Sequence, residues 1–68
     1  MSLSVLVNGE ARTLPGGATV ADVVSELSGG GRGTAVARNG EVVPRSLWSR
    51  TALASGDAVE VLTAAQGG

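Results

Sequence analysis

The 68-residue sequence contains no cysteine, histidine, tyrosine or phenylalanine, and all five of its basic residues are arginine. Without cysteine, disulfide bonds, thiolate nucleophiles and thiolate metal sites are excluded. Without histidine, the commonest general base and the commonest metal ligand are missing. Without lysine, there is no amine for a Schiff base or a P-loop. Most side-chain catalysis is therefore closed to this sequence, and we predict neither catalytic nor metal-binding residues.

Aromatic residues and charge are also scarce. Trp48 is the only aromatic residue, and six carboxylates against five arginines give a formal net charge of −1. A nucleic-acid partner would require a basic stripe with stacking aromatics, so none is expected. No apolar run approaches the roughly 18 residues that cross a membrane, and the first residues lack the basic and apolar regions of a signal peptide. We therefore expect a cytoplasmic protein without a membrane partner.

The length of the chain limits where a site can lie. A domain of about 60 residues buries only about 60% of the surface that its unfolded chain exposes. The 68 residues, of which 43% are hydrophobic, suffice for one small core. A deep catalytic cavity is not expected inside such a body, so we expect function to lie on a surface or at a terminus.

The first half of the sequence predicts a hairpin and then a helix. Residues 2–7 alternate as in a strand, and Asn8-Gly9 is a strong hairpin signal because both turn positions need positive φ. Residues 10–14 return as a second strand. A helix should begin near Val20, after a Thr19–Asp22 pair that resembles a capping box. Its apolar face lies at i, i+3, i+4 and i+7: Val20, Val23, Val24 and Leu27.

Three further strands are predicted in the second half, at residues 34–38, 41–43 and 58–63. Asn39-Gly40 forms a second hairpin turn between the first two. Residues 46–48 are too short for an α-helix, and we expect one tight turn there. Residues 64–68 have no apolar anchor and predict a flexible tail.

The order of these elements predicts the fold. A hairpin, a crossover helix and further strands indicate an α+β domain, with a mixed sheet of four to five strands and one helix packed on one face. The first and last strands should lie parallel at the centre of the sheet. This is the β-grasp arrangement that ubiquitin-like proteins share. Residues 1–63 are the predicted β-grasp domain, and residues 64–68 are the tail that ends in Gly-Gly.

Five short motifs resemble, in order and spacing, those of the ThiS family, the sulfur carriers of thiamine biosynthesis. They are Asn8-Gly9-Glu10, the segment Thr19 to Val24, the segment Asn39 to Arg45 with Trp48 after it, Gly56-Asp57, and Gly67-Gly68. The resemblance covers essentially the whole chain. The one departure is the glycine-rich run at residues 29–33, which contains more glycine than the family needs in that loop.

The resemblance implies a carrier cycle in which this chain is a co-substrate and not an enzyme. A ubiquitin-activating-enzyme-like adenylating partner of the ThiF type uses ATP and magnesium to adenylate the carboxylate of Gly68. A sulfur donor then displaces AMP and leaves a thiocarboxylate. A thiazole synthase of the ThiG type takes that sulfur. The chain itself is expected to bind no cofactor.

The residues of the tail suit that chemistry. Adenylation turns a weakly electrophilic carboxylate into an acyl group with a good leaving group. Gly67 and Gly68 have no Cβ and unrestricted φ, so the tail can enter a narrow channel in extended form, with Gln66 behind them.

A candidate partner surface follows from the strand alternation. Leu6 and Leu62 fall on the faces of their strands opposite the apolar core positions, so they could form an exposed patch near the tail. The alternative is that twist or a bulge buries one of them. Arg45 is either a partner contact or a solvated charge. We expect Trp48 to cover one end of the core rather than to act in recognition.

Three rival functions stay open. The small subunit of molybdopterin synthase also carries sulfur on a terminal Gly-Gly, although the Val43-Pro44-Arg45 segment with Trp48 favours the thiamine family. A ubiquitin-like modifier would use the same carboxylate to form isopeptide bonds. A passive β-grasp interaction module would do no chemistry with its tail. Deleting Gly68 separates the last from the others, because carriers and modifiers would lose their function whereas a passive module would keep binding its partner.

Overall fold

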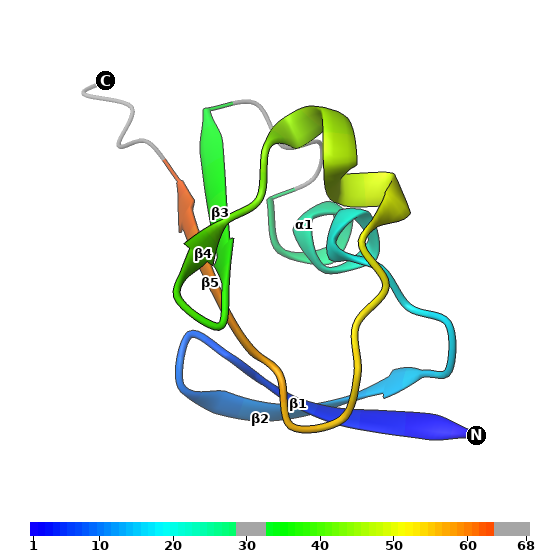
Figure 1. Ribbon diagram of the computed structural model, residues 1–68. Helices are drawn as coiled ribbons and strands as arrows, with labels where there is room; N and C mark the ends of the chain where they lie inside the picture. The colour runs from blue at the N-terminus through cyan, green and yellow to red at the C-terminus, as the bar shows by residue number, and fades with distance from the viewer. Residues whose placement is uncertain (29–32, 64–68) are drawn as a thin grey trace.

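The computed structural model of the chain describes residues 1–28 and 33–63 (Figure 1). These residues form five strands, one α-helix and one 3₁₀ helix. In chain order the elements are β1 (Ser2–Val7), β2 (Glu10–Pro15), α1 (Val20–Ser28), β3 (Thr34–Arg38), β4 (Glu41–Val42), the 3₁₀ helix η1 (Arg45–Arg50) and β5 (Ala58–Thr63).

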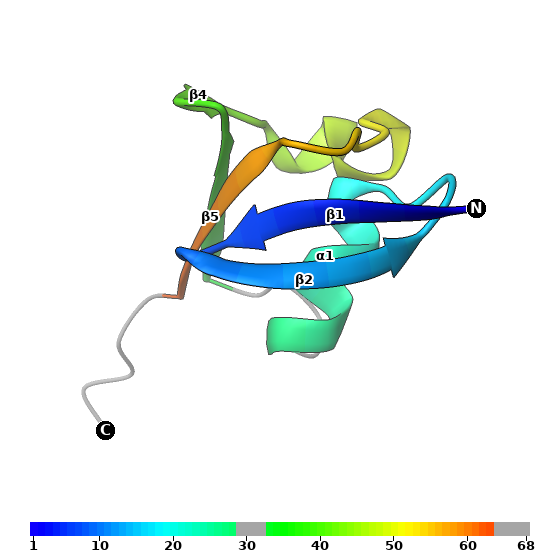
Figure 2. The ribbon, with the colours of Figure 1, turned by 90° about the horizontal axis from the view of Figure 1, so that it is seen from below.

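The five strands form one mixed sheet in the order β2-β1-β5-β3-β4. The terminal strands β1 and β5 are parallel neighbours, whereas β1–β2, β3–β4 and β3–β5 are antiparallel. Helix α1 packs against one face of this strongly twisted sheet (Figures 1 and 2). The predicted α+β fold, with parallel terminal strands at the sheet centre, is confirmed. Neither helix within the described ranges is long and apolar enough to cross a membrane.

Both predicted hairpin turns are present with the backbone that their sequences require. Asn8 and Gly9 have φ of 52° and 84°, and Asn39 and Gly40 have φ of 51° and 85°. Positive φ at both central positions defines the turn that matches strand twist, and Asn-Gly tolerates it at low cost. The first turn pairs Val7 with Glu10. These turns set the register of both hairpins.

The predicted capping box begins the helix. The Thr19 backbone N–H donates to Asp22 Oδ2 at 2.8 Å, and the Asp22 N–H donates back to Thr19 Oγ1 at 3.3 Å. Val20, the first residue of α1, is fully buried. The helix has several β-branched residues, which are weak helix formers. Packing of its valine face on the sheet therefore supplies the stability that propensity does not.

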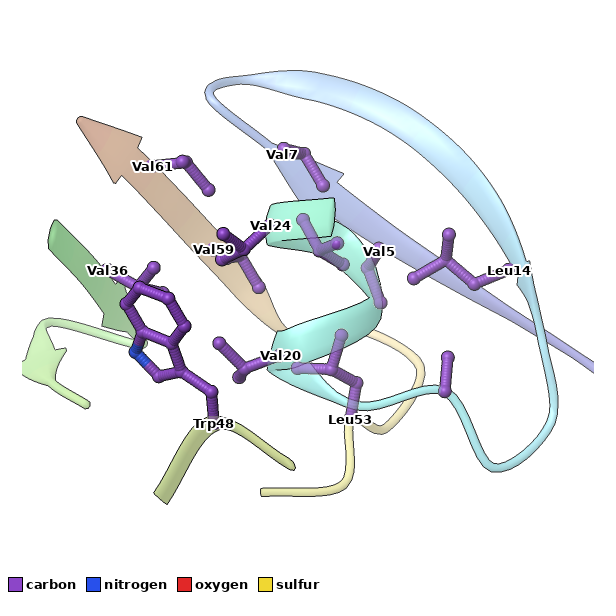
Figure 3. Close-up of a cluster of buried hydrophobic side chains, with 12 residues drawn as sticks. Val5, Val7, Leu14, Val20, Val24, Val36, Trp48, Leu53, Val59 and Val61 are labelled. Carbon is purple, nitrogen blue, oxygen red and sulfur yellow. The ribbon is translucent and has the colours of Figure 1, made fainter. Parts of the chain in front are cut away.

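The core lies between α1 and the sheet (Figure 3). It is built mainly from valines of β1, α1, β3 and β5, with Leu14, Ala18, Trp48 and Leu53 around them. Trp48 is only 7% exposed, and its Nε1–H donates to the Val43 carbonyl at 2.9 Å. The prediction that Trp48 covers one end of the core is confirmed.

The segment around Trp48 is longer than the single tight turn expected at residues 46–48. It forms the 3₁₀ helix η1, and the Leu47 N–H donates to the Pro44 carbonyl at 2.8 Å. Thr51 Oγ1 donates to the Leu47 carbonyl at 2.7 Å and closes the other end. Packing of η1 against α1, with Trp48 buried in the core, holds this helix, so a local pattern could not reveal its length.

Candidate functional site

The residues predicted to carry the chemistry, Gln66, Gly67 and Gly68, lie outside the described residues, as does the rest of the predicted tail. The structure instead describes the strand from which they depart. β5 ends at Thr63. Within the described residues, the candidate site consists of those that hold and surround the end of β5.

The two neighbours of β5 cover different lengths of it. β3 pairs along the entire strand, from Arg38 opposite Val59 to Thr34 opposite Thr63. β1 pairs only with its beginning, where Leu6 lies opposite Ala58 and the next residues pair in turn. Beyond that point the chain of β1 turns away into the first hairpin. The end of β5 therefore has a full strand on one side only.

Asn8, in the first hairpin turn, contacts β5 where β1 stops. Its Oδ1 accepts the Val61 N–H at 2.8 Å, and its Nδ2 donates to the Val61 carbonyl at 3.2 Å. Its own backbone N–H donates to the Val59 carbonyl at 2.9 Å. Sequence analysis assigned Asn8 to the turn alone. The available signal was the choice of asparagine, because aspartate or glycine could serve the turn but neither offers both a donor and an acceptor.

Asn39, in the second hairpin turn, holds the beginning of β5. Its Oδ1 accepts the Ala58 N–H at 2.9 Å, and its backbone N–H donates to the Ala58 carbonyl at 2.7 Å. Its Nδ2 donates to Asp57 Oδ1 at 3.1 Å. Two hairpin asparagines, one on each side, thus bind the same central strand, Asn39 at its first residue and Asn8 at its fourth. This symmetry was also missed by sequence reasoning.

Asp57 organises the turn before β5. The Ala54 N–H donates to its Oδ2 at 2.9 Å, and Arg38 Nη1 lies 3.8 Å from the same oxygen. These contacts lower the pKa of Asp57 below its usual value: the backbone hydrogen bond from Ala54 contributes most, then Asn39, and Arg38 least. Burial opposes them. Both oxygens of the Asp57 carboxylate accept hydrogen bonds from these turns, so its role is structural rather than catalytic.

Leu6 and Leu62 both lie on the outer face of the sheet, opposite α1, with 45% and 68% of their surfaces exposed. The exposure follows the strand alternation, and neither residue is buried by twist. Leu6 lies opposite Ala58, however, which places Leu62 four residues further along β5. At about 3.3 Å per residue this offset is about 13 Å. The two leucines are therefore not in contact, and exposed Glu60 lies on the same face between them.

Small apolar residues widen this outer face. Ala11 lies opposite Leu6 on β2, and Ala35 lies opposite Leu62 on β3, and both are exposed. Alanine side chains leave the backbone close to a partner's surface. We call Leu6, Ala11, Ala35, Ala58 and Leu62 the outer apolar face.

Arg45 lies apart from that face. It is the first residue of η1 and is exposed, and its guanidinium carbon lies 5.7 Å from the centroid of the Trp48 ring. That distance suits a cation–π contact. The structure therefore groups Arg45 with Trp48 and not with the two leucines. Among residues 1–28 and 33–63, no three acidic side chains gather in a way that could hold a metal ion.

A mixed sheet with parallel terminal strands, a helix on one face and a last strand that ends beside the first hairpin defines a ubiquitin-like β-grasp protein. The sequence model of the ThiS family matches residues 5–68. The chain therefore belongs to the ThiS family, the sulfur carriers of thiamine biosynthesis.

Two similar proteins agree with this assignment. The crystal structure of the thiamine biosynthesis protein ThiS from Geobacter metallireducens superposes with a TM-score of 0.77 at 33% identity, covering 97% of this chain and 100% of that one. A thiazole synthase from Paramagnetospirillum magneticum is 35% identical over 66 residues. That match covers 97% of this chain but only 20% of the relative, so the chain spans about a fifth of that protein's length.

Proposed function

We propose that this chain carries sulfur on the carboxylate of Gly68 and delivers it to a thiazole synthase. The observation that carries the proposal is the family match, which runs from residue 5 through residue 68 and so includes the terminal Gly67-Gly68. The scarcity of catalytic side chains supports the same conclusion, because a carrier needs a reactive terminus and not an active site. We propose that the chain is a co-substrate modified by its partners in the cytoplasm.

The proposed cycle begins with adenylation. A carboxylate oxygen of Gly68 attacks the α-phosphorus of an ATP held with magnesium by a ThiF-type adenylating enzyme. Pyrophosphate leaves, and the product is an acyl-adenylate. The terminal sulfur of a donor then attacks the acyl carbon, and AMP leaves with the electron pair of the C–O bond. A sulfide donor gives the thiocarboxylate directly. A persulfide donor gives an acyl disulfide, and a partner thiol then attacks the donor's sulfur, forms a disulfide with it and releases the thiocarboxylate with the electron pair of the S–S bond. This chain contributes the acyl group, and its partners contribute every other reactant.

The folded domain would present the acyl group from a rigid base. β5 is central in the sheet, and Val59 and Val61 are buried in the core. β3 pairs along it as far as Thr63, and on the other side β1 and then the Asn8 carboxamide bind it as far as Val61. Gly67 and Gly68 would bring the carboxylate into a narrow channel because neither has a Cβ.

The relative from Paramagnetospirillum magneticum supports the proposed sulfur acceptor. A segment like this chain makes up a fifth of a polypeptide that is named thiazole synthase. Such an arrangement suits a carrier whose cargo is consumed by the enzyme joined to it, because linkage raises the effective concentration of one for the other.

We further propose that the outer apolar face docks the adenylating enzyme and the thiazole synthase. Leu6 and Leu62 are exposed aliphatic residues on a face whose other members are small, and Leu62 adjoins the end of β5. The two leucines are separate contact points on one face, with Glu60 between them, so the docking role rests on the alanines that extend the apolar surface around each leucine. Arg45, which lies beside Trp48, is a candidate for a separate polar contact.

Intact-mass spectrometry tests the carrier function. The chain is incubated with the ThiF-type enzyme, magnesium-ATP and a sulfur source, and the product is digested. We expect an oxygen-to-sulfur mass gain confined to the C-terminal peptide and absent when Gly68 is deleted. Absence of the gain with an enzyme that is active on another carrier would refute the proposal and favour a modifier or a passive module.

A further inference from the structure

The backbone of β5 alternates its hydrogen-bonding groups between its two neighbours. On the side of β1, the Leu6 N–H donates to the Asp57 carbonyl and the Asn8 N–H donates to the Val59 carbonyl, both at 2.9 Å. The next residue of β5 that faces this side is Val61. β1 ends at Val7, so no strand residue follows to bind Val61 there.

The carboxamide of Asn8 takes the place of that missing residue. It accepts the Val61 N–H at 2.8 Å and donates to the Val61 carbonyl at 3.2 Å. A side-chain amide has one acceptor and two donors, so it reproduces the pairing of a peptide group in a ladder. The hairpin turn is thereby connected to the strand across 53 residues of sequence.

We propose that Asn8 is a positioning residue that fixes the direction in which the chain leaves β5 toward the reactive carboxylate. Val61 is two residues before Thr63, the last residue of β5. Five residues follow Thr63, and five residues reach at most about 18 Å. β3 pairs with β5 as far as Thr63, so Asn8 acts on the other edge of the strand, and a shift of that edge at Val61 displaces the region that Gly68 can reach. This inference rests on the proposed carrier function.

The chain supplies a matched control in Asn39. Both asparagines occupy the first position of an Asn-Gly turn at φ near 50°, and both bind β5 through their carboxamides. Asn39 binds Ala58, the first residue of the strand, three residues before Val61. Substitution by glycine keeps the positive φ of either turn and removes the carboxamide. Asn8→Gly and Asn39→Gly therefore remove similar interactions at different distances from the tail.

Amide hydrogen exchange is the first readout, and it needs no partner. In Asn8→Gly we expect the Val61 N–H to exchange at least about tenfold faster, because opening no longer breaks the side-chain bond. In Asn39→Gly the Val61 rate should match wild type, and the Ala58 rate should rise instead. An unchanged Val61 rate in Asn8→Gly would overturn the inference whatever the activity.

Thiocarboxylate formation with the ThiF-type enzyme is the second readout. A misdirected tail reaches the reactive geometry less often, although the docking face is untouched. In Asn8→Gly we therefore expect kcat to fall between about tenfold and a hundredfold with KM nearly unchanged. Asn39→Gly should keep the wild-type kcat. Asn8→Asp retains the acceptor for the Val61 N–H but not the donor, so it should give an intermediate kcat.

The outcomes separate this inference from the carrier function. If kcat falls equally in Asn8→Gly and Asn39→Gly, and in proportion to the fall in melting temperature, Asn8 has a structural role only. Wild-type kcat in Asn8→Gly would also overturn the inference and leave the carrier function standing. If Asn8→Gly does not fold, Asn8→Asp decides by the same two readouts. Failure of the wild-type chain to gain sulfur would instead refute the carrier function, and this inference with it.

Discussion

The Asn39 carboxamide donates from Nδ2 to Asp57 Oδ1 at 3.1 Å, which joins the second hairpin turn to the turn before β5. The other Asp57 oxygen accepts the Ala54 N–H at 2.9 Å. Gly56, inside the same turn, has φ of 93° and donates from its N–H to the Ser4 carbonyl. The ionised Asp57 carboxylate thus holds together the loops at the beginning of the central strand.

This arrangement predicts a loss of stability in acid. The pKa of Asp57 is lower in the folded protein than the usual value of an aspartate, chiefly because the Ala54 N–H donates to the carboxylate. The unfolded chain therefore binds the proton more readily, so the stabilisation is present above about pH 4 and disappears as pH falls through the lower folded pKa. Urea unfolding at a series of pH values should show this fall. Asp57→Asn should lower stability at pH 7 and flatten the acid dependence; an undiminished dependence in that variant would contradict the assignment.

If the outer apolar face docks the partners, substitutions on it should weaken partner binding and leave the stability of the fold unchanged. Changing both Leu6 and Leu62 to serine should weaken both partner complexes by at least about tenfold, because each leucine loses apolar area that a partner would bury. The melting temperature should hardly change, because the two side chains are already exposed. Isothermal titration calorimetry measures the affinities.

Leu47→Ser is the matched control for that variant. Leu47 lies on η1 and is 44% exposed, against 45% for Leu6. Its substitution should leave both affinities at the wild-type value. Equal weakening by the control, or undiminished binding of the double variant, would remove the docking role from the outer apolar face.

Removing the single side-chain hydrogen bond of Trp48 should lower the free energy of unfolding substantially. Trp48→Phe keeps most of the ring but leaves the Val43 carbonyl without the Nε1–H bond, so we expect a loss of about 1–3 kcal/mol. Trp48→Ala also opens a cavity and should cost about 3–5 kcal/mol. Urea unfolding followed by far-UV circular dichroism measures both, because Trp48 is the only aromatic fluorophore. Equal stability of the phenylalanine variant and wild type would show that the hydrogen bond contributes nothing.

A side chain at position 9 should destabilise the protein only through the positive φ that Gly9 adopts. A Cβ at this position would meet no atom within 4 Å, but φ is 84°. Gly9→Ala should therefore destabilise by about 1–2 kcal/mol through backbone strain alone. Gly9→Asn should cost less, because asparagine tolerates left-handed backbone. Thermal unfolding of both variants tests this, and an alanine variant as stable as wild type would argue that the turn changes type.

Much of the fold could be predicted because its signals are local. The two Asn-Gly turns, the Thr19–Asp22 capping box and the strand alternation each depend on residues a few positions apart. The helix crosses over from β2 to β3, and the parallel pairing of β1 and β5 arises where β5 lies antiparallel to β3, between the two hairpins. The length of η1 escaped prediction because Trp48 is held by contacts with the distant core, and six residues are too few to show a period.

The candidate site divides in the same way. The exposed faces of Leu6 and Leu62 follow from alternation within each strand. Their separation of about 13 Å along the sheet depends on the register of β1 against β5, which no short pattern reveals. Arg45 was grouped with the leucines as a partner-surface candidate, and only the fold shows that it lies beside Trp48 instead.

The sequence by itself determined the turns, the helix start and the family motifs, because backbone conformation at glycine and asparagine and the capping of a helix are decided by neighbouring atoms. The tertiary structure alone decided that Asn8 and Asn39 bind β5 from opposite sides, at Val61 and at Ala58. Those bonds form between residues that are far apart in the chain, and they exist only once the sheet has brought the hairpin turns beside the last strand.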